Sequence, residues 1–229
     1  PGVIADQYGD TVVVQLLSAG AEHWRDAIAD ALMSQPNVAR VWERSDADVR
    51  ALEGLPPRSG LLRGDAPAAP LIVHEHGLQF KVEMEAGHKT GYYLDQRDNH
   101  LFLKDFANGR AVLDCFCYSG GFALHALAGH AKSVTAIDSS GPALAGAREN
   151  LILNQLPPVE WIEGDVFQTL HQFRDAGRRF ADLNAVPRPS KREERVVAFV
   201  RDFAKCHGLS SMLDSAGNVI IKKPARSEE

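Results

Sequence analysis

Strand and helix patterns alternate in the middle of the chain, and this alternation constrains the fold more than any other feature of the sequence. The runs AVLDCF, SVTAID and VEWIEGD are typical of strands. Between them, FALHALAG, ended by Gly129, and the segment that begins at Pro142 are typical of helices. Alternation of this kind indicates a parallel sheet with right-handed crossovers. We therefore predict an α/β fold whose strands, ending at Phe116, Asp138 and Asp165, are adjacent and parallel.

The first 70 residues indicate a small α/β domain. Two β-rich runs flank Tyr8-Gly9-Asp10, which is a hairpin signal. The segment AEHWRDAIADALM predicts one helix with an apolar face, and NVARVWERSD predicts another strand. That apolar face is formed by Trp24, Ile28, Ala31 and Leu32. The Pro- and Gly-rich segment GLPPRSGLLRGDAPAAP then reads as a linker or exposed loop at a domain boundary.

Residues 71–180 form the second predicted domain, and residues 181–229 form a tail. LIVHEHGLQFKVEME predicts two strands around a His76-Gly77 turn, and GHKTGYYLDQRDNHLFLKDFA leads into a helix. In the tail, Ser190 and Glu193 make a capping box. A stripe of apolar residues then predicts a helix to about Cys206, and the residues around Gly217 predict a hairpin. The apolar stripe consists of Val196, Phe199, Val200 and Phe203.

Charge and cysteine content narrow the classes of partner. The net charge of −5 gives no general attraction to nucleic acid, so RNA binding would need a local basic patch or a further module. The three cysteines do not make a disulfide framework, and Cys-x-Cys spacing is weak evidence for zinc. We therefore expect a reducing, cytoplasmic location and no metal site. No apolar run is long enough for a membrane span, and no signal peptide opens the chain. Because the sequence begins at Pro1 without Met, its natural start could lie upstream.

Residues suited to ligand binding follow each of the three central strands. Ligands of open parallel sheets bind beyond the carboxyl ends of the strands. Ser119-Gly120-Gly121 makes a tight turn into a helix N-terminus, which lets a ligand approach the backbone. Asp138 lies 18 residues after Gly120, near the spacing at which an acidic side chain binds ribose hydroxyls. Asp165 could accept a hydrogen bond from an adenine amino group, although such residues also cap helices. Together they favour an adenosine-containing ligand.

The loop chemistry distinguishes between adenosine ligands. The loop lacks the Gly-x-Gly-x-x-Gly pattern of dinucleotide sites, and no Gly-Lys-Ser/Thr phosphate loop is present. S-adenosylmethionine needs no pyrophosphate-binding loop, so it fits the sequence better than a nicotinamide or a nucleoside triphosphate.

Five ordered motifs then carry a family resemblance. GHKTGYYLDQRDN, VLDCFCYSGGFALHAL, VTAIDSS, ARENLILN and GDVFQTL together resemble the bacterial 23S rRNA large-subunit 5-methylcytosine methyltransferases of the RlmI type. The resemblance covers roughly residues 1–180. It implies a class I methyltransferase (Rossmann-like) fold, S-adenosylmethionine as methyl donor and a cytosine of 23S rRNA as target. Family members also carry a small RNA-binding PUA-like domain upstream of the part matched here.

The resemblance also assigns roles to individual residues. The loop would wrap the methionine part of the cofactor; its residues are Phe116, Cys117, Tyr118, Ser119, Gly120 and Gly121. Asp138 and Ser139 would lie at the ribose, and Asp165 with Val166 would flank the adenine. Three residues of the first motif would close the pocket, namely Tyr92, Gln96 and Arg97. Ordinary packing remains an alternative for Tyr92 and Tyr93, and His88 and Lys89 would either meet RNA phosphate or lie in a solvated loop.

The resemblance breaks down near Phe180. Methylation of cytosine C5 needs a thiolate that attacks C6 of the flipped base. The resemblance places this cysteine in a Phe-Ser-Cys-Ser-Gly-like loop and expects an Asp-Pro-Pro-Lys-Phe-like loop before it, and neither occurs. We therefore assign no catalytic residue and expect Cys115 and Cys117 to be small buried side chains. The tail instead resembles the start of cytosolic aminoacyl-histidine dipeptidases of the M20 type, which would join two unrelated sequences.

Three interpretations follow from this break. The first is an rRNA cytosine methyltransferase by lineage, with an incomplete parallel sheet that keeps the cofactor half of its site. The second is a non-catalytic S-adenosylmethionine-binding module, and the third is a fragment derived from a metallodipeptidase. Loss of the fourth strand would expose an apolar edge of the sheet. We expect the tail or a second chain to cover that edge, so a homo-oligomer is possible.

Overall fold

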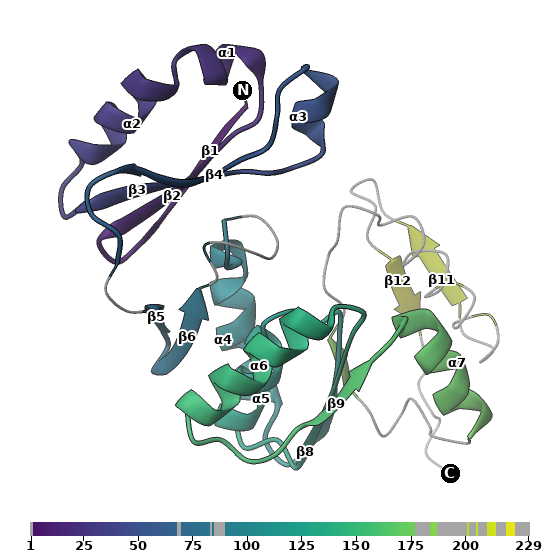
Figure 1. Cartoon of the computed structure of the whole chain (residues 1–229). Helices are drawn as coiled ribbons and strands as arrows, with labels where there is room; N and C mark the ends of the chain where they lie inside the picture. The colour runs from purple at the N-terminus through teal and green to yellow at the C-terminus, as the bar shows by residue number, and fades with distance from the viewer. Residues whose placement is uncertain are drawn as a thin grey trace, which may run out of the picture. The chain divides into compact units, whose positions relative to one another are not determined.

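The protein, shown here as a computed structural model, divides into two compact units, Pro1–Val186 and Pro187–Glu229. The structure describes residues 2–67, 70–82, 84, 90–176, 184–186, 201, 205, 210–213 and 219–222. The first unit contains the sheets and helices that position the candidate site (Figure 1).

A four-stranded sheet with helices begins the first unit. Its strands lie in the order β1-β2-β3-β4, and only the β2–β3 pair is parallel. The strands are β1 (Val3–Tyr8), β2 (Thr11–Leu16), β3 (Arg40–Ser45) and β4 (Arg58–Arg63). Helices α1 (Ala19–His23) and α2 (Arg25–Met33) connect β2 to β3, and α3 (Val49–Leu52) follows β3. Every residue of β2 is buried because both faces of the strand are covered. Val12 and Val14 pack beneath the helices on one face, and Val13 on the other face belongs to the larger core.

Two predictions for this region are wrong. The single predicted helix is two helices, because Trp24 leaves the helical conformation (φ −96°, ψ 15°) and its N–H closes the last turn of α1. As a result, Trp24 is 62% exposed and Ala31 is also exposed, so neither belongs to the apolar face. The predicted linker contains β4, which pairs with β3 and places Leu62 against the helices. Pairing with a distant strand here outweighs the loop-like local composition.

The predicted parallel sheet forms the centre of the first unit. Its order is β10-β7-β8-β9, and all its pairs are parallel. The strands are β7 (Ala111–Cys115), β8 (Ser133–Asp138), β9 (Glu160–Glu163) and β10 (Asn184–Val186). The adjacency and direction of the three central strands are therefore confirmed. β10 pairs with the free edge of β7 and lies within residues 181–229, so the tail covers this edge as we expected and supplies a short fourth strand.

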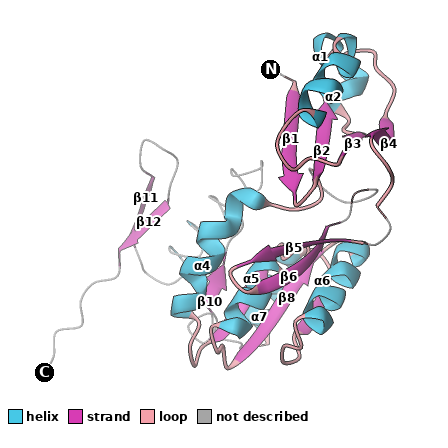
Figure 2. Ribbon diagram, turned by 90° about the vertical axis from the view of Figure 1, so that its left-hand side faces the viewer, coloured by secondary structure: helices cyan, strands magenta, loops and turns pink. Residues whose placement is uncertain are grey.

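Helices lie on both faces of this sheet (Figures 1 and 2). The helices are α5 (Gly121–Ala128), α6 (Gly141–Leu153) and α7 (Val166–Asp175). On one face, Val112 and Ala136 pack in one core with Leu124 of α5 and Leu144 of α6. On the other face, Leu113, Cys115 and Ile137 pack with residues of α7. This alternation along each strand is the pattern of a doubly wound sheet, and it confirms the predicted fold class.

A hairpin and a further helix precede the parallel sheet. β5 (Leu71–Glu75) and β6 (Leu78–Val82) pair around the predicted turn, and η1 (Leu94–Gln96) leads into α4 (Arg97–Phe106). The side chain of Asn154, the C-cap residue of α6, accepts from the N–H of Gln79 and donates to its carbonyl oxygen. The helix therefore supplies hydrogen bonds that a neighbouring strand would otherwise give to β6.

The described part of the second unit is small. β11 (Ser210–Leu213) and β12 (Val219–Lys222) pair antiparallel, so the predicted hairpin strands are present. The capping box, the apolar stripe, Cys206 and the turn around Gly217 lie outside the described residues, as do His88 and Lys89 of the first unit. Within the described ranges, no helix is long and apolar enough to cross a membrane.

Candidate functional site

The loop after β7 has an unusual backbone. Phe116 (φ 61°), Tyr118 (φ 49°) and Gly120 (φ 81°) all have left-handed conformations. This region is uncommon for bulky residues such as Phe and Tyr, and strained backbone of this kind is concentrated at functional sites. Two backbone hydrogen bonds hold the loop, from Cys117 N–H to the carbonyl of Ile137 and from Gly120 N–H to the carbonyl of Cys117.

Asp138 connects this loop to the end of β8. Its Oδ2 accepts from the N–H of Tyr118 at 2.8 Å, and its Oδ1 accepts from the N–H of Ser140 at 2.9 Å. The side chain is half-buried, while Ser139 is exposed. Each carboxylate oxygen has a second lone pair, so Asp138 can hold the loop and still accept hydrogen bonds from a ligand.

The third strand end lies beside the first two. Gly164 donates its N–H to the carbonyl oxygen of Asp138, and the ring centroids of Phe116 and Phe167 lie 5.8 Å apart. Asp165 is the N-cap of α7, where its carboxylate accepts from the N–H of Gln168. Val166 is buried in the core beneath α7. The structure therefore brings the three strand ends together, and it gives Asp165 the capping role that its sequence position also allowed.

The tyrosine-containing motif lies against the same loop. The hydroxyl of Tyr118 donates to the carbonyl oxygen of Gly91 at 3.3 Å, and the rings of Tyr93 and Tyr118 pack edge to face. Tyr92 is buried and packs on Phe80 and His100. Of the other predicted pocket residues, Gln96 is buried and accepts a hydrogen bond from Asn99, whereas Arg97 is exposed at the start of α4.

Two glycines of the loop are closely packed against neighbouring side chains and do not border open space. A Cβ atom at Gly120 would lie 3.0 Å from Leu124 and 3.2 Å from Ala147, and one at Gly121 would lie 2.7 Å from the ring of His100. The two positions therefore have no room for a side chain, because α4, α5 and α6 converge beneath the loop.

Sequence reasoning missed Asn150, a buried side chain of α6 that supports the loop. Its Nδ2 donates to the carbonyl oxygen of Ser119, and its Oδ1 accepts from the N–H of Lys81 on β6. The side chain thus joins the loop to the hairpin. The motif ARENLILN contains this residue, but helical periodicity gives no sign that a polar side chain faces inward.

The two cysteines near the loop are buried. Cys115 ends β7 and Cys117 lies in the loop, with exposures of 5% and 3%. Burial, together with the nearby charge of Asp114, raises the pKa of the Cys115 thiol to about 12. A protonated, enclosed thiol is a poor nucleophile. This agrees with the expectation that these residues are small core side chains.

A sequence-family comparison identifies this arrangement. The model of the S-adenosylmethionine-dependent methyltransferase family matches residues 33–225. The chain belongs to this family.

Relatives at higher identity have a more specific name. The chain is 47% identical over 182 residues to the ribosomal RNA large subunit methyltransferase I of Shewanella amazonensis, an alignment that covers 79% of this chain and 46% of that protein. It is 39% identical over 225 residues to the protein of the same name from Yersinia pseudotuberculosis, covering 96% of this chain and 57% of the relative. The chain therefore spans about half the length of these relatives.

Solved structures agree on the fold. A SAM-dependent methyltransferase from Streptococcus mutans aligns with a TM-score of 0.67 and 27% identity, over 77% of this chain and 46% of that chain. Trm5b from Pyrococcus abyssi aligns over 95% of this chain and 73% of its own length with a TM-score of 0.63, and its 17% identity shows a shared fold alone.

The comparisons do not support the dipeptidase resemblance of the tail. The family match continues to residue 225, and the alignment with the Yersinia protein covers 96% of the chain. Both extend beyond Phe180 into the tail. The methyltransferase resemblance thus accounts for most of the segment that we had attributed to a second ancestry.

Proposed function

We propose that this chain is the cofactor-binding part of an S-adenosylmethionine-dependent methyltransferase that acts on large-subunit ribosomal RNA. The contact that carries the proposal is the one between Asp138 and the loop after β7. Family membership supports the cofactor, and one structural relative, at 27% identity and a TM-score of 0.66, is complexed with SAH. The names of the relatives support the RNA substrate.

The proposed cofactor site follows the three strand ends. Phe116 to Gly121 would surround the methionine part, Asp138 with Ser139 would bind the ribose, and Asp165 with Val166 would flank the adenine. Asp138 is suited to the ribose because its carboxylate is fixed by two N–H groups and keeps further lone pairs. Tyr92, Gln96 and Arg97 would close the pocket from the neighbouring motif. This motif contacts the loop through the hydrogen bond from the Tyr118 hydroxyl to the carbonyl oxygen of Gly91.

Calorimetry of SAH binding tests this site. We expect SAH to bind the wild type and NAD⁺ not to bind. Asp138→Ala should weaken SAH binding about 10- to 100-fold, because a hydrogen bond to a charged group contributes about 1.5–3 kcal/mol. Asp105→Ala, which removes an exposed carboxylate from α4, is the matched control and should leave the affinity unchanged.

A comparison of two nucleosides distinguishes hydrogen bonds between Asp138 and the ribose from support of the loop alone. Adenosine should bind the wild type more tightly than 2′-deoxyadenosine, and Asp138→Ala should lose this preference. If Asp138 only holds the loop, the variant will weaken both nucleosides equally, and the assignment of the ribose to Asp138 is then wrong. Preferential binding of NAD⁺ would contradict the cofactor itself.

We also propose that the chain by itself transfers methyl groups to cytosine C5 very slowly. The reaction needs a positioned thiolate, and the buried Cys115 and Cys117 do not supply one. The test is transfer of a labelled methyl group from S-adenosylmethionine to unmodified large-subunit rRNA. Incorporation at one cytosine that disappears when all three cysteines are replaced by serine would contradict this proposal.

A further inference from the structure

Three ionisable side chains meet beneath the candidate cofactor loop. They are Glu75 at the end of β5, His100 in α4 and His125 in α5, with exposures of 2%, 3% and 0%. One potential metal-ligating atom from each residue lies within 4.8 Å of the other two. The hairpin, α4 and α5 thus converge on a cluster of side chains that is enclosed by protein.

The hydrogen bonds of His125 fix its tautomer. Its Nδ1 lies 2.8 Å from the carbonyl oxygen of Gly121, so this nitrogen carries the proton and donates it. Among the residues that the structure describes, none forms a hydrogen bond with its Nε2, which lies 3.5 Å from Oε1 of Glu75. With the proton of the neutral ring on Nδ1, Nε2 bears a lone pair that faces Glu75.

The opposing group is the carboxylate of Glu75, whose Oε1 also lies 2.6 Å from Nδ1 of His100 and accepts a hydrogen bond from it. A carboxylate and an imidazole lone pair therefore face each other inside the protein. Two electron-rich atoms in this arrangement repel each other unless a cation lies between them.

From this geometry we infer that Glu75, His125 and His100 bind a divalent transition-metal ion of the zinc class. Imidazole nitrogen and carboxylate oxygen are common zinc ligands at about 2.0–2.1 Å, which in a tetrahedral site separates two ligand atoms by about 3.3 Å. The 3.5 Å between His125 Nε2 and Glu75 Oε1 matches this separation. The hydrogen bond from His125 to Gly121 is also the kind of outer contact that orients a metal-binding histidine.

His100 changes its role when the ion binds. Its Nδ1 lies 2.6 Å from Glu75 Oε1, which is a hydrogen-bond distance, and its ring stacks on that of His125 at 4.9 Å. Coordination by His100 breaks this hydrogen bond and turns the ring out of the stack. If His100 binds through Nδ1, the proton that this atom carries moves to Nε2, because a neutral imidazole that coordinates through one nitrogen keeps its proton on the other.

The ion would act on the cofactor loop from below. His125 holds the carbonyl oxygen of Gly121, the first residue of α5, and the ring of His100 lies against the Cα of the same glycine. A metal ion would therefore fix the start of α5 to the hairpin and to α4. Its role is structural, because all three proposed ligands are buried beneath the loop.

Metal titration of the wild-type chain tests this inference without any methyltransferase assay. After EDTA treatment and dialysis, we expect one equivalent of Zn²⁺ to bind by calorimetry. Co²⁺ should give the intense visible absorption of a tetrahedral site, which Zn²⁺ then removes.

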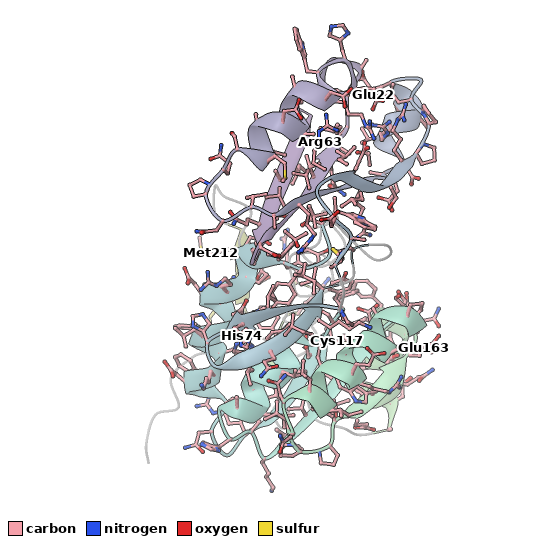
Figure 3. All side chains as sticks on the ribbon, turned by 60° about the vertical axis from the view of Figure 1, so that its left-hand side comes forward. Glu22, Arg63, His74, Cys117, Glu163 and Met212 are labelled. Carbon is pink, nitrogen blue, oxygen red and sulfur yellow. The ribbon has the colours of Figure 1, made fainter. Side chains whose placement is uncertain are left out.

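Two variants locate the site. Glu75→Gln keeps the shape of the side chain but removes its charge, and it should weaken Zn²⁺ binding about 100-fold. His74→Gln is the matched control, because His74 is the exposed neighbour of Glu75 on β5 (Figure 3), and it should bind as the wild type does. Circular dichroism of both variants checks that they fold.

Two results would overturn the inference. They are no Zn²⁺ or Co²⁺ binding by the folded wild type, and equal affinity in folded Glu75→Gln. Loss of Zn²⁺ binding in His74→Gln would show that the metal site lies on the surface, at His74, and not in the buried cluster. SAH binding is measured on the same samples, so failure of the metal site and failure of the proposed function are distinguishable.

Discussion

Single residues determine the chemistry available at the candidate site. Left-handed Phe116 and Tyr118 turn the loop after β7, and the Asp138 carboxylate accepts the N–H of Tyr118. Backbone strain of about 1–3 kcal/mol at such positions persists only where surrounding contacts maintain it. Asp138 and the packing of Tyr118 on Tyr93 are two such contacts. Replacing Asp138 or Tyr93 would therefore change the conformation of the loop and not only the contacts of the replaced side chain.

Cys115 should be unreactive in the folded protein. Its pKa of about 12 exceeds the ordinary value of 9.0 by three units, so the thiolate fraction at pH 8 falls about 1,000-fold. We expect iodoacetamide at pH 8 to modify all three cysteines in urea but to leave Cys115 unmodified in the native chain, as measured by peptide mass spectrometry. Rapid native modification of Cys115 would restore it as a candidate nucleophile.

Close contacts between helices determine how the elements beneath the site pack. Gly129 ends α5, and a Cβ atom there would lie 2.1 Å from the carbonyl oxygen of Lys104 in α4. The backbones of α4 and α5 therefore approach each other at this point. Because α4 carries His100 and α5 carries Gly121, this contact also sets the spacing of the cluster beneath the loop.

Alanine substitutions at two glycines test the packing of these helices. Gly129→Ala should destabilise the fold by about 1–3 kcal/mol, because the methyl group meets backbone that cannot rotate away. Gly146→Ala, in the interior of α6 with nothing within 4 Å of the added carbon, should stabilise it by about 0.5–1 kcal/mol through helix propensity. Urea unfolding measures both, and equal effects would argue against the close approach of α4 and α5.

At the scale of the first unit, a hydrogen-bonded chain joins the N-terminal sheet to the tyrosine-containing motif. The hydroxyls of Tyr8 and Thr90 lie 2.7 Å apart, Tyr8 also donates to the carbonyl oxygen of Tyr92, and Thr90 donates to Asp6. Tyr8 is 1% exposed and belongs to the main core. The N-terminal sheet therefore reaches the segment that lies against the cofactor loop.

Tyr8→Phe should weaken this connection in a pH-dependent way. At pH 8 we expect a loss of about 1–3 kcal/mol, because the variant leaves buried polar partners without the hydroxyl. Burial raises the pKa of Tyr8 from 10.0 to about 12, so the protonated phenol stabilises the fold fully below pH 10 and this contribution falls as pH rises from 10 to 12. The difference in the free energy of unfolding between wild type and variant should therefore shrink over that range, as measured by urea unfolding. A constant difference would show that the ionisation of Tyr8 is not linked to folding.

Local pattern was sufficient to predict the central architecture. The strand and helix periods around Gly129 and Pro142, together with the direction rule for crossover connections, predict three adjacent parallel strands. The same rule places Asp138 and Asp165 at one edge of the sheet. These predictions succeed because periodicity and crossover handedness depend on residues close together in sequence.

Only the tertiary structure decided the contacts between distant segments. β4 forms in a loop-like sequence because β3 offers it a partner, and β10 forms beside β7 from a segment that the sequence assigned to no strand. His100 lies 25 residues after Glu75 and 25 residues before His125, and no spacing rule connects the three. Their meeting beneath Gly121, like the inward-facing amide of Asn150, results from the packing of helices against a hairpin. Packing depends on the shapes of whole elements, which no local window of sequence contains.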